Sequence, residues 1–207
     1  KAYVTPVAVY YYTDAQLAVD LKVLDGFRAD PVAGGEFEAG EVAITFLATI
    51  FKKVKLNTHE NVGWGKIAIP EESFHTSGMW LSFDEPATRD LDRDQVATGL
   101  AGIAHVLRNI APVYCLCDAR DIGAEAQVRS PHSQRPAVYL YDMVPGGVGL
   151  SDRLFDVRDE LLEAALAMVL ACPCDNGCPT CVGPQVESNP RAKRSAVLLL
   201  ERVSGAR

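Results

Sequence analysis

Four of the chain's six cysteines fall within a span of ten residues near its C-terminal end. They are Cys172, Cys174, Cys178 and Cys181, in a Cys-x-Cys-x3-Cys-x2-Cys array. Thiolate sulfurs are soft ligands, and a Cys-x2-Cys turn offers two of the four ligands of a tetrahedral zinc ion from one tight loop. Because four thiolates leave no coordination position open for a substrate, we expect one structural Zn²⁺ ion at these cysteines.

Two other chemistries suit four clustered cysteines. The thiols can pair as two disulfide bonds, or they can hold an iron–sulfur cluster, which also takes four cysteine ligands. The N-terminal residues lack the basic and then apolar pattern of a secretion signal, and we recognise no apolar run of the ~20 residues that a membrane helix needs. We therefore expect a cytoplasmic protein without a membrane partner, in which disulfides are rare and zinc is favoured.

Cys115 and Cys117 form a separate Cys-x-Cys pair. We interpret them as small buried hydrophobic side chains, with a second redox or metal pair as the alternative. The charged residues 118–121 beside them are interpreted as a salt-bridged scaffold, with a contact to a partner domain as the alternative. The four histidines, His59, His75, His105 and His132, show no metal-binding spacing. His105 falls within a helical pattern, and we interpret it as a hydrogen-bonded packing residue.

The sequence shows no motif of a hydrolase or of a nucleotide-binding enzyme. It has no Gly-x-Ser-x-Gly nucleophile elbow, and its glycines match neither Gly-x-Gly-x-x-Gly nor a phosphate loop ending in Gly-Lys-Ser/Thr. The glycine-rich segment Tyr141–Ser151 connects a predicted strand to a predicted helix, where backbone N–H groups can hold a phosphate. We expect a tight structural turn there, with a phosphate or DNA-backbone contact as the alternative. We expect no catalytic residue in the chain.

The charge balance limits how the chain can contact nucleic acid. Its formal net charge is −7, whereas nonspecific affinity for DNA comes from clustered lysine and arginine. Any DNA contact must therefore be local. Lys52, Lys53 and Lys55 lie in one strand-like run and are our candidates for nucleic-acid binding, with a solvated face as the alternative. Residues 191–194 form a second basic spot.

The first part of the chain has the pattern of β-strands. β-branched and aromatic residues concentrate in four runs, at 4–12, 41–56, 66–69 and 79–83. Turn residues separate these runs, at Asp25-Gly26, Gly34-Gly35, Gly63–Gly65 and Pro70. We expect a small antiparallel sheet or barrel up to about residue 86.

The part after residue 86 has the pattern of helices around one buried strand. Apolar residues recur at helical spacing over 96–110, and Pro112 is expected to stop that helix. A strand is expected at 136–144. Ser151 is expected to cap one long helix that leads into the first cysteine, and Asn189-Pro190 is expected to open a last helix.

These patterns predict an α+β fold. A β-rich subdomain at residues 1–86 is expected to precede a helical subdomain with the zinc site at residues 87–207, and the two are expected to pack as one module. Because the chain opens in strand-like sequence without an initiator methionine, we expect it to be a piece of a longer protein.

Seven segments of the chain resemble one known family. They are Tyr11–Thr13, Phe51–Val54, Thr58–Gly65, Gly99–Leu107, Cys117–Gly123, Tyr141–Ser151 and Cys172–Pro184. Together they look like the MrfA-type zinc-binding domain at the C-terminal end of RecQ-like superfamily 2 DNA helicases. The resemblance covers nearly the whole chain, and its last two segments are specific to the family.

The resemblance implies that the chain is an accessory domain of an ATP-dependent 3′-to-5′ DNA helicase or translocase involved in DNA repair. It implies zinc binding by the same four cysteines, the motor domains of the same polypeptide as partners, and single-stranded DNA bound through the parent protein. Because the chain shows no ATPase motif, we expect it to brace the motor and to assist in engaging single-stranded DNA. The alternatives are a protein-interaction or structural domain without DNA contact and, third, a redox enzyme that uses the cysteines.

Overall fold

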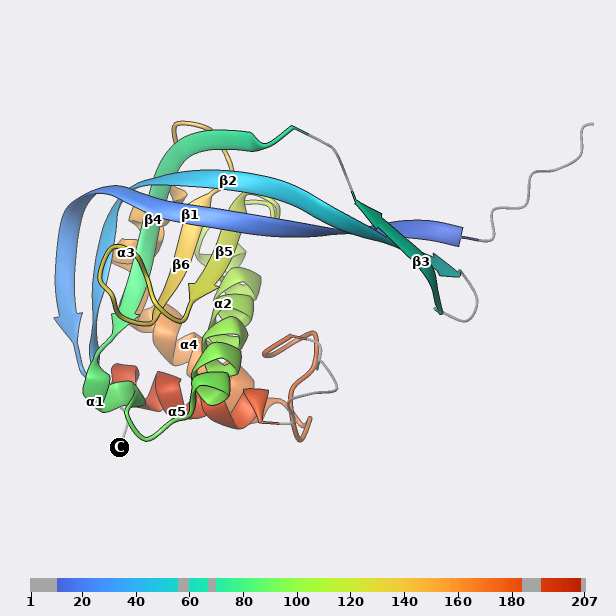
Figure 1. Cartoon of the computed structure of the whole chain (residues 1–207). Coiled ribbons are helices and arrows are strands. Elements are labelled where there is room, and N and C mark those ends of the chain that lie inside the picture. Colours follow the sequence, from blue (N-terminus) through green and yellow to red (C-terminus); the bar gives the residue numbers. More distant parts are fainter. Residues whose placement is uncertain (1–10, 56–59, 67–69, 184–190, 206–207) are drawn as a thin grey trace, which may run out of the picture. The chain divides into compact units, whose positions relative to one another are not determined.

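The computed structural model describes residues 11–55, 60–66, 70–183 and 191–205. Among these residues it has six strands and five helices, which Figure 1 shows in chain order. The strands are β1 (Tyr11–Val32), β2 (Gly35–Lys55), β3 (Asn61–Lys66), β4 (Glu72–Phe83), β5 (Ile122–Gln127) and β6 (Ala137–Asp142). The helices are α1 (Glu85–Thr88), α2 (Arg93–Cys115), α3 (Leu150–Asp156), α4 (Arg158–Ala171) and α5 (Ala192–Ser204). Strands dominate the first part and helices the later part, so the predicted α+β class is confirmed.

The backbone groups into two compact units. The smaller unit comprises the described residues of 1–20 and 44–73, and the larger unit comprises those of 21–43 and 74–207. Strands β1 and β2 each contribute residues to both units. The predicted subdomain boundary at residue 86 stays a prediction.

Strands β4, β6 and β5 lie side by side in the larger unit. β6 pairs antiparallel with β4, where Leu140 lies opposite Met79, and with β5, where Leu140 lies opposite Ala124. Every residue of β6 is buried, as expected for a strand covered on both faces, so the strand predicted within 136–144 is confirmed. Helix α2 packs against β5 and β6 and contacts α4 and α5, which makes it the central helix of this core (Figure 1).

Helix α2 has the predicted spacing of apolar residues. Its buried side chains include Val96, Leu100, Ile103, Leu107 and Ile110. A capping box begins the helix: the Gln95 backbone N–H donates to the Asp92 carboxylate at 2.8 Å, and the Asp92 N–H donates to the Gln95 side-chain oxygen at 3.0 Å. Two of the free N–H groups at the helix start are thereby satisfied, and the predicted helix is confirmed.

The predicted stop of this helix at Pro112 was wrong, because α2 continues to Cys115. A proline in the last turn removes only one backbone hydrogen bond, and the buried Ile110 and Ala111 beside it hold the turn against the core. The helix ends at Cys115 instead, and the left-handed backbone of the next residue, Leu116 (φ 53°), lets the Cys117 N–H donate to the Pro112 carbonyl at 3.3 Å.

Contrary to expectation, one segment is long and apolar enough to span a membrane, judged by length and composition alone. This segment is α2, and 56% of its most apolar window is buried inside the protein. Since α2 is the central helix of the larger unit, its burial accounts for its apolar composition without a bilayer.

Two of the predicted turns lie inside strands. Asp25-Gly26 belongs to β1 and Gly63–Gly65 belongs to β3, so both predictions were wrong. β1 passes close to β2 at this point, because a Cβ atom on Gly40 of β2 would lie only 1.9 Å from the Asp25 carbonyl oxygen. Gly40 therefore permits a close approach of the two strands. The turn predicted at Gly34-Gly35 is confirmed between β1 and β2, where Gly34 has φ 71°.

The remaining strand predictions are met in part. Strand β2 covers the predicted run at 41–56 up to Lys55, and β4 contains the run at 79–83. Residues 4–10 and 67–69 of the other predicted runs lie outside the described residues. Strand β5 was not predicted, because its sequence IGAEAQ holds only one β-branched residue.

The predicted long helix before the cysteines is two helices, α3 and α4, which break at Val157. Arg158 holds this break in place: its guanidinium donates to the Phe155 carbonyl at 3.0 Å and to the Asp30 carboxylate, and it lies over the Phe155 ring. The contact with Asp30 joins residues 128 positions apart in sequence, so helical periodicity could not reveal it. The predicted opening of the last helix at Asn189-Pro190 lies outside the described residues, and α5 begins at Ala192.

Candidate metal centre

The four clustered cysteines bring their sulfurs together directly after α4. The Cys172 Sγ atom lies 3.5 Å from the Sγ atoms of both Cys174 and Cys178. The Cys181 Sγ atom lies 3.4 Å from the Cys174 Sγ atom and 3.6 Å from the Cys178 Sγ atom. All four lie within 4.8 Å of one another. Zinc–sulfur bonds of ~2.3 Å place the sulfurs of a tetrahedral site about 3.8 Å apart. The spacing therefore fits one ion and is far longer than the ~2.05 Å of a disulfide.

The local chain conformation explains how four ligands meet within so short a segment. Cys172 ends α4 with an extended backbone, which turns the chain out of the helix. Gly177 and Gly183 have φ values of 130° and 90°, a region that L side chains rarely adopt, so the chain reverses on either side of the second ligand pair. Between them the N–H groups of Cys181 and Gly183 both donate to the Cys178 carbonyl, at 3.1 and 3.0 Å.

The thiols of this cluster affect one another's protonation. Backbone N–H groups of Cys181 and Thr180 lower the pKa of Cys178 to about 6. Burial, together with hydrogen bonds from the neighbouring cysteines, raises the pKa of Cys174 to about 12. Adjacent thiolates repel one another, so a thiolate at Cys178 opposes the loss of the proton from Cys174. A divalent cation relieves that repulsion and binds all four as thiolates, so the donor set suits zinc.

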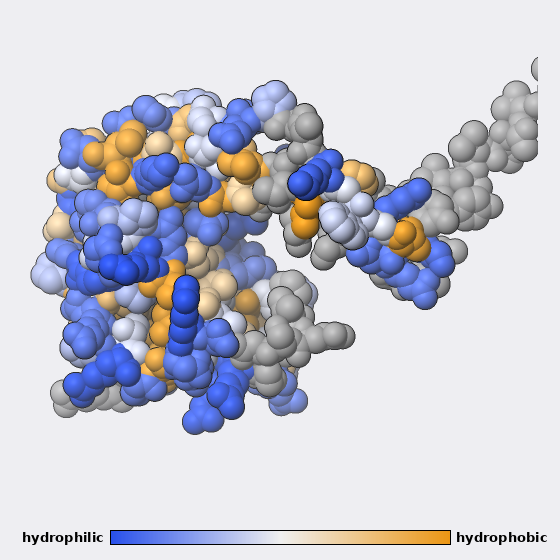
Figure 2. All heavy atoms as spheres, in the orientation of Figure 1, coloured by the Kyte–Doolittle hydropathy of each residue, from blue (hydrophilic) through white to orange (hydrophobic). Residues whose placement is uncertain are grey.

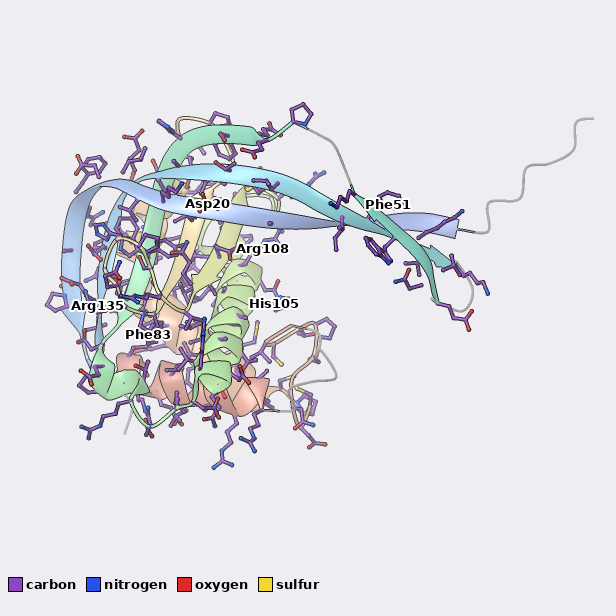
Figure 3. All side chains as sticks on the ribbon, in the orientation of Figure 1. Asp20, Phe51, Phe83, His105, Arg108 and Arg135 are labelled. Atoms are coloured by element: carbon purple, nitrogen blue, oxygen red, sulfur yellow. The ribbon has the colours of Figure 1, made fainter. Side chains whose placement is uncertain are left out.

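Helix α2 supports the Cys178–Cys181 turn from one side. Figure 3 shows the side chain of His105 on α2. The His105 Nε2 atom lies 2.6 Å from the Pro179 carbonyl oxygen, and the Asn109 amide donates to the Pro179 and Thr180 carbonyls at 3.4 Å each. The interpretation of His105 as a hydrogen-bonded packing residue is therefore confirmed. Carbonyls that would face solvent at the tip of the turn are held by α2 instead.

Helix α5 supports the first ligand pair through Lys193. Its Nζ atom donates to the Cys172 and Cys174 carbonyls at 2.6 and 2.7 Å, and its backbone N–H donates to the Asn176 carbonyl at 3.2 Å. In the sequence Lys193 was only part of a basic spot, and nothing in its neighbours indicated a role beside the cysteines. Its ammonium group lies where it offsets the negative charge of a tetrathiolate metal centre.

Close packing joins the cluster to the core. Cys181 is fully buried, and Val182 next to it contacts α2 at Gly102, where a Cβ atom would lie 3.0 Å from the Val182 side chain. One turn earlier a Cβ atom on Gly99 would lie 2.8 Å from the Leu199 side chain of α5. The two glycines of α2 therefore admit both the cysteine turn and α5.

The glycine-rich segment after β6 is built around a buried carboxylate. Asp142 Oδ2 accepts hydrogen bonds from the N–H groups of Val148 and Leu150 at 2.8 and 3.2 Å, and Oδ1 accepts them from the Ser151 N–H and hydroxyl at 2.8 and 2.5 Å. An internal anion thus occupies the start of α3, where a phosphate would bind. The predicted structural turn is confirmed. The predicted Ser151 cap was wrong, because Gly149 is the N-terminal capping residue of α3 and the Ser151 hydroxyl donates to the Asp142 carboxylate.

The residues before β5 carry no second metal group among the described residues. Cys115 and Cys117 are half-buried against the core, and burial raises the pKa of both thiols, that of Cys115 to about 11. This agrees with their interpretation as packing residues, since a raised pKa keeps a thiol protonated and unreactive. The exposed Arg120 guanidinium pairs with the Asp118 carboxylate at 3.1 Å, which agrees with the prediction of a salt-bridged scaffold.

The candidate DNA-binding lysines lie at the end of β2, which forms an antiparallel ribbon with β3 in the smaller unit. The register places Lys52 opposite Trp64 and Lys53 opposite Gly63. Lys55 forms an ion pair with Glu60 at 2.9 Å. The side chain of Lys52 lies outside the described residues. The three lysines thus lie on one ribbon, and their binding to DNA stays a prediction.

Comparison with known proteins identifies the cysteine region. The model of one family, the MrfA Zn-binding domain, matches residues 103–182. The uncharacterized ATP-dependent helicase YprA of Bacillus subtilis is 41% identical over 204 residues, which are 99% of this chain and 27% of that protein. The uncharacterized protein MJ1572.1 of Methanocaldococcus jannaschii is 31% identical over 83 residues, which are 39% of this chain and 74% of that protein.

Solved structures of the DUF1998 helicase MrfA are also similar. One bound to DNA matches with a TM-score of 0.73 and 40% identity, over 95% of this chain and 26% of that chain. The chain thus spans about a quarter of the length of the helicases YprA and MrfA. The family match includes all four clustered cysteines, and the resemblance expected from the sequence motifs is confirmed. The chain belongs to the MrfA zinc-binding domain family.

Proposed function

We propose that this chain is the zinc-binding accessory domain of an ATP-dependent DNA helicase. The observation that carries this proposal is the convergence of four sulfurs within 4.8 Å, in a chain that aligns over 99% of its length with a helicase of Bacillus subtilis. The motor domains of the same polypeptide are the proposed partners, and ATP hydrolysis is their task. The domain braces that motor.

The proposed metal is a single structural Zn²⁺ ion held by Cys172, Cys174, Cys178 and Cys181. When bound, it supplies four metal–thiolate bonds, whose free energy contributes to folding. The hydrogen bonds of His105, Asn109 and Lys193 then join the loaded turn to α2 and α5. Loss of the ion is expected to release the end of α4 and the start of α5 together.

Metal analysis of the purified chain tests this part of the proposal. A colourless protein with one zinc per chain supports it. A brown protein that contains iron overturns it in favour of an iron–sulfur cluster. Titration of reactive thiols with and without a chelator gives a second readout, because bound zinc protects four of the six cysteines.

Other elements of the proposal rest on the family resemblance. These are movement from 3′ to 5′ on single-stranded DNA and a role in DNA repair. A place in the cytoplasm is proposed from the sequence instead, in which we recognise no secretion signal. One solved structure of the relative MrfA is bound to DNA, which supports DNA binding by the proposed parent protein. The division into a β-rich and a helical subdomain at residue 86 belongs to the same proposal.

Lys52, Lys53 and Lys55 are the proposed contacts to the DNA backbone. Replacing all three by alanine is expected to reduce the dependence of DNA affinity on salt concentration. Each phosphate contact releases counterions from the DNA, so binding with fewer contacts releases fewer of them. A salt dependence equal to that of the wild type would remove these lysines from the proposal.

The second candidate function is a protein-interaction or structural domain without DNA contact. The net charge of −7 favours it, and so does the ion pair that partly neutralises Lys55. Fluorescence anisotropy with labelled single-stranded DNA separates the two: no binding by the zinc-loaded chain, together with normal DNA binding by a helicase that lacks it, would favour the second candidate.

A further inference from the structure

The two tryptophans of the chain lie in opposite environments. Trp80 on β4 is fully buried, and its indole N–H donates to the Glu38 carboxylate at 2.7 Å. Trp64 on β3 is 72% exposed. An indole gains more from burial than most side chains, so an exposed tryptophan in the middle of a strand is best explained by a ligand that covers it.

Trp64 is not needed to fill the ribbon on which it lies. The ring of Phe51 on β2 covers the facing glycine of β3, since a Cβ atom on Gly65 would lie 2.7 Å from that ring (Figure 3). Trp64 and Lys66, two positions apart, share the other face of β3. The ribbon thus has its own aromatic contact on one side and an exposed indole on the other.

The ribbon is basic although the chain is acidic. Residues 50–66 contain four lysines and one glutamate, in a chain whose formal net charge is −7. The register pairs Lys52 with Trp64 itself, and a shift in register between Lys53 and Val54 adds a bulge beside them. Bulges increase strand twist and redirect side chains, and they recur at binding sites. Figure 2 shows hydrophobic and hydrophilic atoms intermixed on this ribbon.

We propose that Trp64 stacks on a base of single-stranded DNA while the ribbon lysines contact the neighbouring phosphates. This deepens the proposed function and rests on its DNA contact. Interleaved aromatic and basic residues are the pattern by which proteins bind single strands regardless of sequence, because every base has a flat face and every nucleotide a phosphate. A protein partner fits less well, since lysine is depleted at protein interfaces. Paired bases are stacked already, so a duplex offers the indole no free face.

The test compares the zinc-loaded chain with its Trp64→Ala and Trp64→Phe variants. Anisotropy of a labelled oligothymidine strand is expected to show affinity about tenfold weaker for Trp64→Ala, with partial recovery for Trp64→Phe, whose smaller ring still stacks. A blunt duplex of equal length is expected to bind all three proteins alike. In the wild type, the strand is expected to quench the exposed indole, while the buried Trp80 reports that the larger unit is folded.

The matched control is Phe27→Ala, because Phe27 is another aromatic residue on a strand and is 68% exposed. Its affinity for the strand is expected to equal that of the wild type. Equal losses in Phe27→Ala and Trp64→Ala would overturn the assignment to Trp64. Unchanged single-strand affinity in Trp64→Ala would also overturn it, because that result is expected of a protein-docking residue. An equal loss of affinity for the single strand and for the duplex would overturn it too, because that result is expected of a phosphate contact.

The lysine variant separates this inference from the proposed function. Replacing Lys52, Lys53 and Lys55 by alanine is expected to lower the salt dependence, whereas Trp64→Ala is expected to leave it unchanged because stacking releases no counterions. A reduced salt dependence in the lysine variant with full affinity in Trp64→Ala would overturn the stacking alone. Absence of any single-strand binding by the wild type would overturn both the stacking and the lysine contacts, and normal DNA binding by a helicase that lacks the chain would then favour the second candidate function.

Discussion

The cysteine cluster and the β2–β3 ribbon present contrasting solutions to the placement of chemically useful side chains. At the cluster, backbone carbonyls of the cysteine segment are hydrogen-bonded to His105, Asn109 and Lys193, and Cys181 is fully buried. On the ribbon, Trp64 is 72% exposed among lysines. Saturated polar contacts fix one geometry, which suits a permanent ion. Exposed aromatic and basic groups suit a ligand that arrives and leaves.

The strongest way to break the comparison is to remove a metal ligand. Cys181→Ser is expected to abolish stoichiometric zinc binding and to lower the free energy of unfolding by at least about 3 kcal/mol, because it removes a metal–thiolate bond and buries an unmatched hydroxyl. Metal analysis and denaturant unfolding measure the two effects. The matched control is Cys117→Ser, a half-buried cysteine outside the cluster, which is expected to retain the zinc. Full zinc content in Cys181→Ser would contradict the four-ligand site.

Asp142→Asn tests whether saturated polar contacts stabilise the larger unit beyond the metal. The amide NH₂ group would face N–H groups that now donate to the carboxylate, so a loss of about 2–4 kcal/mol in the free energy of unfolding is expected. Urea unfolding of the zinc-loaded chain measures it. Asp118→Asn, at an exposed ion pair, is the control and is expected to change little. Equal effects in the two variants would show that the buried carboxylate has no special role.

Lys193→Met isolates the support that α5 gives the cluster. The change keeps most of the aliphatic side chain and removes both hydrogen bonds to the Cys172 and Cys174 carbonyls. A loss of about 1–2 kcal/mol in the free energy of unfolding is expected, together with faster zinc release to a chelator. The neighbouring exposed Arg194→Met variant is the control. Unchanged zinc release in Lys193→Met would mean that α5 contributes packing alone.

The smallest effect on stability is expected at the ribbon. Trp64→Ala is expected to change the free energy of unfolding by less than about 0.5 kcal/mol, because the indole is mostly exposed. Phe51→Ala is expected to cost more, since its ring covers Gly65. Thermal unfolding of both variants measures the two losses of stability. A larger loss in Trp64→Ala than in Phe51→Ala would mean that the indole stabilises the fold.

The sequence predicted the cluster well because its four ligands lie within ten residues, so spacing alone limits their geometry. Its supports were not predictable in the same way. His105, Asn109 and Lys193 reach the cysteines from helices elsewhere in the chain, and no local pattern marks such contacts. Helix α2 was predicted from its apolar period, which reports burial directly.

The misplaced turns and the misplaced helix stop share one physical cause. Glycine and proline indicate turns only when tertiary packing does not override them. At Gly65 the missing side chain admits the ring of Phe51, and at Gly40 it admits the strand that carries Asp25 and Gly26. At Pro112 the packing of α2 carries the helix past the proline. These outcomes depend on contacts that the local sequence does not contain.

The glycines of α2 couple two structural events that otherwise look independent. Gly102 touches the residue after the last metal ligand, and Gly99 touches α5 one turn away. A methyl group added at Gly102 would displace the cysteine segment, and one added at Gly99 would displace α5. The two elements are also joined by the hydrogen bonds of Lys193, so a displacement of one would affect the other. We therefore expect metal binding and the packing of the final helix to occur in one cooperative step. A chain that loses its ion should lose its C-terminal helix contacts within the same transition.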